Sequence, residues 1–198
     1  LTVVTITLQN AESLPVSGQP VEISVEPAEE VIITQPSEQT NRKGQTTAQL
    51  LVKRAGLKTV KAKSGEVELD TTATILFEAG PVDKVVLSAK PPRVKPQLAA
   101  TVTIKLFDQY QNPIKSEQVS LKTTLGEIGA ATDNGDGTYS AVFSAPEQLG
   151  TAILEATAAG KSESINLEVS DKSVIEITPE ITQLARGESI QFKASEEV

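Results

Sequence analysis

The segment Val4-Thr5-Ile6-Thr7-Leu8 returns 98 residues later as Val102-Thr103-Ile104-Lys105-Leu106. In both copies apolar residues occupy every second position, which places three apolar side chains on one face of a β-strand. A second match follows at an offset of 94, because Gly56 and Gly150 begin the same spacing of apolar residues. A repeat of roughly 90 residues is the size of one β-sandwich domain, so the sequence predicts a tandem array.

The same period of two recurs along most of the chain, and Gly, Asn or Pro separate the alternating segments. No stretch sustains a helical period between capping residues. We therefore predict an all-β fold of tandem immunoglobulin-like (Ig-like) β-sandwich modules with Greek-key connections. Further strands are expected in residues 21–25, 46–50, 67–69, 73–77, 119–121, 139–143 and 165–169.

The repeat divides the chain into three parts. Residues 80–170 are expected to form a complete Ig-like β-sandwich. Residues 1–79 are expected to form an Ig-like β-sandwich that lacks its first strand, because residue 1 already lies in the equivalent of the second strand. Residues 171–198 look like the start of a third Ig-like module. The first strand of the complete module is expected at 82–89, and the strands of the third module at 174–179 and 187–194.

Two explanations account for the missing first strand of residues 1–79. Either the sequence is a section of a longer array, or a neighbouring chain fills the position by strand addition. The junctions between the modules are short, which favours a semi-rigid rod over modules on a flexible string. The junction residues are Gly80, Pro81, Ser170 and Asp171.

Composition excludes several classes of partner. The formal net charge is −8, and nucleic-acid binding requires a clustered basic surface, so we predict no nucleic-acid partner. The chain has no Cys, which excludes disulfides and thiolate metal sites but does not decide the cellular compartment. No apolar segment is long enough to span a membrane, so no membrane insertion is predicted within this sequence.

Catalytic chemistry finds little support. His and Cys are both absent, which excludes the usual acyl-transfer triads and imidazole metal sites. With 26 acidic residues, counting alone does not exclude a pair of catalytic carboxylates for glycoside hydrolysis. Sugar-binding sites, however, use stacking against aromatic side chains, and the chain has no Trp. No glycine-rich loop opens a helix, so no phosphate-binding loop is predicted. We expect no enzyme, no catalytic residues and no cofactor.

The run Asp133-Asn134-Gly135-Asp136-Gly137 is the strongest candidate for a metal site. Asp133 and Asp136 are weak calcium candidates, because a hard cation prefers oxygen ligands. The EF-hand pattern fails, since it needs a Glu at its twelfth position, where the chain has Ser144. A tight turn into the strand at Tyr139 is the favoured interpretation. Its turn and fold positions are Asn134, Gly135, Gly137 and Tyr139.

Two further loops have a structural and a functional interpretation. The run Asp108-Gln109-Tyr110-Gln111-Asn112-Pro113 joins two expected strands, and Asp108, Asn112 and Pro113 are typical turn residues. A turn is the favoured interpretation, and recognition through an exposed Tyr110 is the alternative. Residues 26–30 carry three acidic side chains. They predict a solvated loop, with a share in a cation site between modules as the alternative.

Four segments together suggest a family. Residues 80–89, 108–114, 124–128 and 132–139 resemble bacterial Ig-like repeats of the invasin/intimin type. The Gly-Asp-Gly-Thr-Tyr run also occurs in filamin-type repeats, so it is not decisive alone. The resemblance covers nearly all of the second module, whereas residues 1–79 diverge more, and residues 174–194 are more similar to another bacterial Ig-like group.

This resemblance implies a non-catalytic structural spacer, or stalk, in an exported prokaryotic surface, adhesin or fibre protein. The implied location is the cell surface or the extracellular space, with the periplasm as another candidate. Implied partners are the neighbouring Ig-like modules of the same chain, and a protein or glycan receptor is a further candidate. The alternative function is a binding or assembly module. Such a module would be an accessory region of a carbohydrate-active enzyme, or an envelope-complex subunit that docks through an exposed sheet edge.

Overall fold

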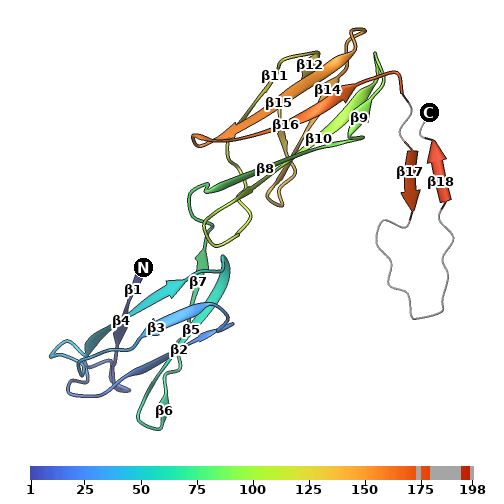
Figure 1. The fold of residues 1–198 in the computed structure, drawn as a ribbon. Coiled ribbons are helices and arrows are strands. Elements are labelled where there is room, and N and C mark those ends of the chain that lie inside the picture. The colour runs from blue at the N-terminus through green and yellow to red at the C-terminus, as the bar shows by residue number, and fades with distance from the viewer. Residues whose placement is uncertain (173–174, 179–192, 197–198) are drawn as a thin grey trace, which may run out of the picture. The chain divides into compact units, whose positions relative to one another are not determined.

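The fold is all-β in the described residues, which confirms the predicted class (Figure 1). The structure is a computed structural model, and it describes residues 1–172, 175–178 and 193–196. The chain forms two compact units. Unit 1 comprises Leu1–Gly80 with Tyr110–Asn112, and unit 2 comprises Pro81–Gln109 with Pro113–Val198. No helix in the described residues is long and apolar enough to cross a membrane.

Unit 1 is a small sandwich of two antiparallel sheets. One sheet has the strand order β1-β4-β3, and in the other β5 pairs with β2 on one side and with β6 and β7 on the other. The strands are β1 (Thr2–Thr7), β2 (Glu22–Glu26), β3 (Val31–Thr34), β4 (Gln45–Val52), β5 (Gly56–Ser64), β6 (Val67–Glu68) and β7 (Ala73–Phe77).

The core of unit 1 lies between these two sheets and contains only aliphatic residues among its buried members. Alternation along each strand sends every second side chain inward, as the period of two predicts. The result is a modest core for a domain of this size, as the low aromatic content suggests. Its buried members are Ile6, Leu8, Val21, Ile23, Val25, Ala48, Leu50 and Val60.

Unit 2 repeats this plan with a fuller set of strands. One sheet has the order β12-β14-β10-β8, with β13 also paired to β14, and the other has the order β11-β15-β16-β9. The strands are β8 (Lys84–Lys90), β9 (Arg93–Val94), β10 (Ala99–Phe107), β11 (Val119–Thr123), β12 (Glu127–Ile128), β13 (Thr132–Asp133), β14 (Thr138–Ser144), β15 (Gly150–Ala158) and β16 (Lys161–Val169).

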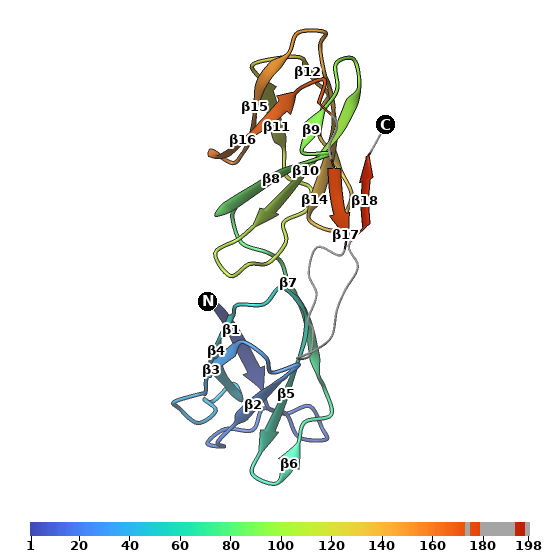
Figure 2. The ribbon, with the colours of Figure 1, turned by 45° about the vertical axis from the view of Figure 1, so that its right-hand side comes forward.

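The sequence repeat is also a repeat of strand register. Ile6 in β1 lies opposite Thr46 in β4, and Ile104 in β10 lies opposite Tyr139 in β14. In unit 2 the next strand along is β8, which lies beside β10 (Figures 1 and 2). The core of unit 2 adds aromatic residues, because Tyr139 and Phe143 are both fully buried.

The third module was predicted from two strands, and much of that prediction lies outside the described residues. The described part contains β17 (Ile175–Thr178), which pairs antiparallel with β18 (Lys193–Glu196). β17 falls within the strand predicted at 174–179. β18 overlaps the strand predicted at 187–194 only at Lys193 and Ala194, because residues 179–192 are among those not described.

Candidate functional site

The turn at 133–137 uses its own carboxylates to hold its backbone. Asp133 accepts hydrogen bonds from the Gly135 N–H at 2.8 Å and, through its other oxygen, from the Ser116 N–H at 2.7 Å. Asp136 accepts from the Thr138 hydroxyl at 2.6 Å and from the Thr138 N–H at 2.9 Å. The hydroxyl hydrogen bond, followed by the backbone one, lowers the pKa of the Asp136 carboxyl. These contacts are those of a polar turn that is satisfied locally.

The remaining turn positions complete this arrangement. Asn134 donates from its amide to the Thr138 hydroxyl oxygen at 2.9 Å and accepts from the Ser140 hydroxyl at 3.1 Å. Gly135 and Gly137 have φ of 80° and 89°, values that favour glycine. Within the part of the chain that the structure describes, no three acidic, His or Cys side chains gather in a group that could hold a metal ion.

Tyr139 fastens the loop at 114–117 to β14. Its hydroxyl donates to the Ile114 carbonyl at 3.2 Å and accepts from the Glu117 N–H at 2.9 Å. Burial raises the pKa of Tyr139, which keeps the hydroxyl neutral and able to donate. The sequence marked Tyr139 as a fold position, but it contained no signal for its two partners.

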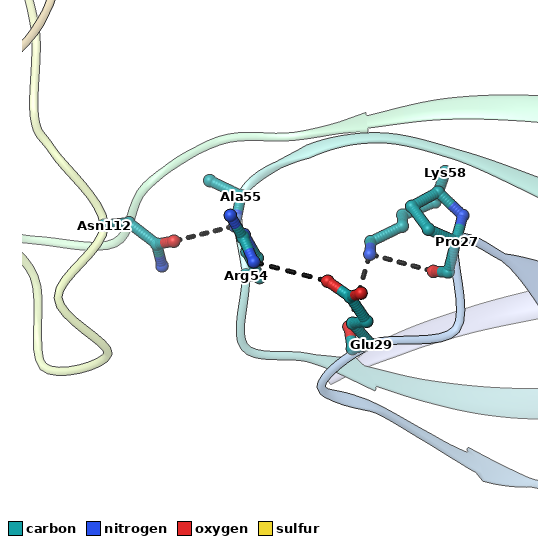
Figure 3. A network of polar contacts seen from close by, with 6 residues as sticks. All are labelled: Pro27, Glu29, Arg54, Ala55, Lys58 and Asn112. Carbon is teal, nitrogen blue, oxygen red and sulfur yellow. Dashed lines mark hydrogen bonds and ion pairs between the residues drawn. The ribbon is translucent and has the colours of Figure 1, made fainter.

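The loop at 108–113 contributes to unit 1 as well as to its own turn. Asn112 accepts a hydrogen bond from the Ala55 N–H at 2.9 Å (Figure 3). It also donates to the Lys53 carbonyl at 2.6 Å. The Lys53 ammonium lies 5.9 Å from the centroid of the Tyr110 ring. Asp108 is buried, and Pro113 forms an isolated bridge with Phe107. The turn prediction described the backbone of this loop and not these contacts.

The predicted junction residues have different surroundings. Gly80 and Pro81 stand where the two units divide. Ser170 is buried, and its N–H donates to the Val94 carbonyl at 2.9 Å. It therefore continues the pairing of β16 with β9 by one residue. Asp171 is exposed.

The acidic loop at 26–30 is exposed, and a lysine from β5 holds it (Figure 3). The buried Lys58 ammonium donates to the carbonyls of Pro27 at 2.9 Å and Glu29 at 3.3 Å. Glu29 also pairs with Arg54 at 3.3 Å. The cations that this loop contacts are thus side chains of the same unit. Sequence reasoning missed Lys58, since an isolated lysine in a strand reads as a solvent-facing residue.

The outer face of β2 and β5 carries two exposed ion pairs. Lys61 contacts Glu26 at 2.8 Å, and Lys63 contacts Glu22 at 2.9 Å. The hydrogen bond and charge of each glutamate raise the pKa of the partner lysine. Exposed pairs of this kind contribute little to stability. Three of these four side chains line a shallow depression. Its lining residues are Glu22, Lys61 and Lys63, together with Ile23, Ser24, Ala62, Glu68, Leu69 and Thr72.

The outer edge of β1 is a second candidate interface. The Leu8 N–H donates to the Gly44 carbonyl, on the side of β4. Because backbone groups of alternate residues point to opposite sides of a strand, Val3, Thr5 and Thr7 direct their N–H and C=O groups away from β4. Among the described residues, no strand pairs with this edge.

The edge of β2 in the other sheet is covered instead. The Gln35 side chain accepts from the Ile23 N–H at 2.8 Å and donates to the Ile23 carbonyl at 2.8 Å. One amide group thereby replaces a neighbouring strand at this position. Covering of this kind prevents pairing with another chain.

Comparison with known proteins agrees with this architecture. The structure is similar to FdeC, an adhesin of Escherichia coli, with a TM-score of 0.63 and 17% identity over 85% of this chain and 59% of that chain. It is similar to InvD of Yersinia pseudotuberculosis, with a TM-score of 0.64 and 22% identity over 91% of this chain and 58% of that chain. This chain therefore spans about three-fifths of the length of each, and at these identities the likeness shows the fold.

A family comparison is more specific for unit 2. Residues 87–174 match the family described as invasin, domain 3. The match begins within β8 and continues past the end of β16, so it spans nearly the whole sandwich of unit 2. It includes three of the four segments on which the resemblance was based, 108–114, 124–128 and 132–139, and only the end of the fourth, 80–89. Residues 87–174 are therefore a bacterial Ig-like domain of the invasin/intimin type, as the sequence predicted.

Proposed function

We propose that this chain is a non-catalytic spacer of tandem Ig-like modules in an exported surface protein of a prokaryote. The observation that carries the proposal is that both units repeat one strand scaffold while polar side chains in or beside their loops bind loop backbone. Asp133, Asp136 and Lys58 all have such partners. Side chains that already hydrogen-bond to the backbone in this way support a structural role more than a ligand-binding role. The adhesin FdeC, with a similar fold, supports the surface location.

A display experiment tests the spacer role. A single-domain antibody is displayed on a bacterial surface with zero, one or two copies of this chain between the antibody and its anchor. A spacer extends the reach of the antibody, so capture of antigen-coated beads through the capsule should rise with each copy. The matched control is a Gly/Ser linker with the same number of residues, which is compact on average and should extend reach less.

Two results count against the spacer. One is bead capture that stays constant as copies are added. The other is saturable binding of the purified chain itself to host cells or to a glycan array, since a spacer has no receptor of its own. Either result would favour a binding module.

A binding or assembly module is the second candidate. The outer edge of β1 favours it, because Val3, Thr5 and Thr7 present backbone groups that another strand can pair with. Such a module would be either an accessory region of a carbohydrate-active enzyme or a subunit of an envelope complex. Glycan-array binding supports the first form, and recovery of a strand-donating partner supports the second.

A further inference from the structure

Residues 84–94 of unit 2 are tied to both of its sheets. β8 pairs antiparallel with β10, from Lys84 beside Phe107 to Lys90 beside Thr101. The chain then crosses to the other sheet, where β9 pairs parallel with β16. β8 is the first strand of this sandwich and β16 is its last. The segment therefore connects the beginning and the end of the sandwich through strand pairing.

The parallel pairing decides how tension acts on the segment. In a parallel pair the N-terminal ends of both strands lie together, so the chain enters β9 at one end of the pair and leaves β16 at the other. A pull on Pro81 and an opposite pull on Asp171 therefore draw β9 and β16 along each other. Sliding of this kind strains all hydrogen bonds of the pair at the same time.

Tension loads β8 in the same direction. The strand directions of two packed sheets differ by about 30°, so a pull from Pro81 acts nearly along β8 while the rest of the sandwich is held from Asp171. β8 also buries Val85 and Leu87 in the core. Its pairing with β10 must therefore slide together with the pairing of β9 and β16, and these apolar side chains must leave the core in the same step.

The hairpin of β15 and β16 has the opposite geometry. These strands are antiparallel, with Gly150 beside Val169 at the open end and Ala158 beside Lys161 at the turn. A pull that separates Gly150 from Val169 breaks one residue pair after another, starting at the open end. Each residue pair then opposes the pull alone. The same unit thus resists force differently when the points of attachment change.

Side chains reinforce the pairing of β9 with β16. The Ser170 N–H donates to the Val94 carbonyl at 2.9 Å, which extends the pairing by one residue. Arg93 contacts one carboxylate oxygen of Glu168 through Nε at 2.8 Å and through Nη2 at 2.7 Å. On the core side, Val94 and Val169 are 2% and 1% exposed. The ion pair and the core contacts must both be disrupted when the two strands slide.

We propose that residues 84–94 act as a clamp that keeps unit 2 folded under tension applied between Pro81 and Asp171. The clamp consists of β8 and β9 with their pairings to β10 and β16. This function goes beyond the spacer role, because a spacer only has to extend reach, whereas a clamp resists force. The inference concerns unit 2 alone and applies equally to a binding module in a surface protein.

Force spectroscopy in two pulling directions tests the clamp on the whole 198-residue chain. The chain contains no Cys, so a pair of introduced cysteines provides unique attachment points for DNA handles. Pro81→Cys with Asp171→Cys loads the clamp by sliding, whereas Gln148→Cys with Asp171→Cys peels β16 from β15. All three positions are exposed. At one loading rate, we expect unfolding of unit 2 to need a several-fold higher force in the sliding direction.

Two matched variants show whether the clamp, and not the stability of the whole unit, sets this force. Val94→Ala weakens the clamp, and Tyr139→Phe weakens the attachment of the loop at 114–117, outside it. Both should lower the free energy of unfolding in denaturant. Only Val94→Ala should lower the sliding force, because interactions that persist until the unit opens do not change its unfolding rate. Arg93→Ala, which leaves the core intact, should lower the force by a smaller amount.

Two outcomes overturn the proposal. One is a sliding force no higher than the peeling force, and the other is a loss of force in Tyr139→Phe as large as that in Val94→Ala. The comparison of directions uses only exposed substitutions, so its result does not depend on whether a core variant folds. Either outcome would leave the spacer role standing, because bead capture through the capsule measures reach and not resistance to force.

Discussion

Tyr139 joins two parts of unit 2 through one buried hydroxyl group. The variant Tyr139→Phe keeps the ring in the core but leaves the Ile114 carbonyl and the Glu117 N–H without this partner. Loss of a buried hydrogen-bond partner costs about 1–3 kcal/mol. Chemical denaturation should show a decrease of this size in the free energy of unfolding of unit 2. Hydrogen exchange at the Glu117 amide should accelerate, and an unchanged rate there would show that the hydroxyl does not hold the loop.

Asp136 makes the 133–137 turn sensitive to acid. Its folded-state pKa is lowered from the ordinary value of 3.8 by the hydrogen bonds from Thr138. The folded state therefore binds this proton less readily than the unfolded state. The contribution of Asp136 to stability is complete above the ordinary pKa and declines as the pH falls from there through the folded-state pKa.

The variant Thr138→Val tests this assignment by removing the hydroxyl and keeping the backbone N–H. Because the hydroxyl is the largest cause of the shift, the pKa of Asp136 should rise part of the way toward its ordinary value. A carbon-detected NMR titration of the carboxyl measures it. Thr132→Val, on the neighbouring strand, is the matched control and should leave this pKa unaltered. A pKa that does not move in Thr138→Val contradicts the assignment.

Single residues also show the limit of sequence reasoning. Gly135, Gly137 and Asn134 could be predicted because a turn with positive φ depends on local backbone geometry. Lys58 could not, because its buried position depends on carbonyls about thirty residues away, in the loop at 26–30. The equivalent residue of unit 2 is the buried Ala152, so the repeat itself gave no indication of a buried lysine.

At the scale of the element, the turn between β13 and β14 contains two glycines that are needed for different reasons. A Cβ atom at Gly137 would collide with the side chain and backbone of Pro113, whereas a Cβ atom at Gly135 would meet nothing within 4 Å. Both residues have positive φ, so an alanine at either position carries about 1–2 kcal/mol of backbone strain. Only Gly137 adds a steric conflict with the loop at 108–113.

The pair of variants Gly135→Ala and Gly137→Ala measures this difference. Thermal unfolding should show that Gly135→Ala lowers the stability of unit 2 by about 1–2 kcal/mol. Gly137→Ala should cost more, because Pro113 is backbone-restricted and cannot move aside easily. Equal losses would mean that the 108–113 loop adjusts at no cost. Backbone strain alone would then explain why glycine is favoured at both positions.

The positions of the main strands and their buried faces were the part of the fold that the sequence predicted best. Alternation marks which face of β10 is buried, and the match between β1 and β10 carried this information to unit 1. The closing of unit 2 by β9 was not predicted, because Arg93 and Val94 form a strand of two residues. A pair of residues has no readable period, and its pairing with β16 depends on how residues 90–96 cross from one sheet to the other.

For the whole molecule, the two units should differ in stability. Unit 2 buries Val85, Leu87 and Val94 from β8 and β9, and each buried side chain of this kind contributes about 1.5–3 kcal/mol. Unit 2 also buries the aromatic side chains of Tyr139 and Phe143, whereas the buried core of unit 1 is aliphatic. Because about 1 kcal/mol corresponds to roughly 4–8 °C in a domain of 60–100 residues, calorimetry should resolve two transitions, with unit 1 unfolding first.

Two core variants assign these transitions. Leu50 and Phe143 are both 0% exposed, one in each unit, and truncation of such residues to alanine costs about 2–5 kcal/mol. Leu50→Ala should lower only the first transition, and Phe143→Ala only the second. A single transition that both variants lower would contradict independent units.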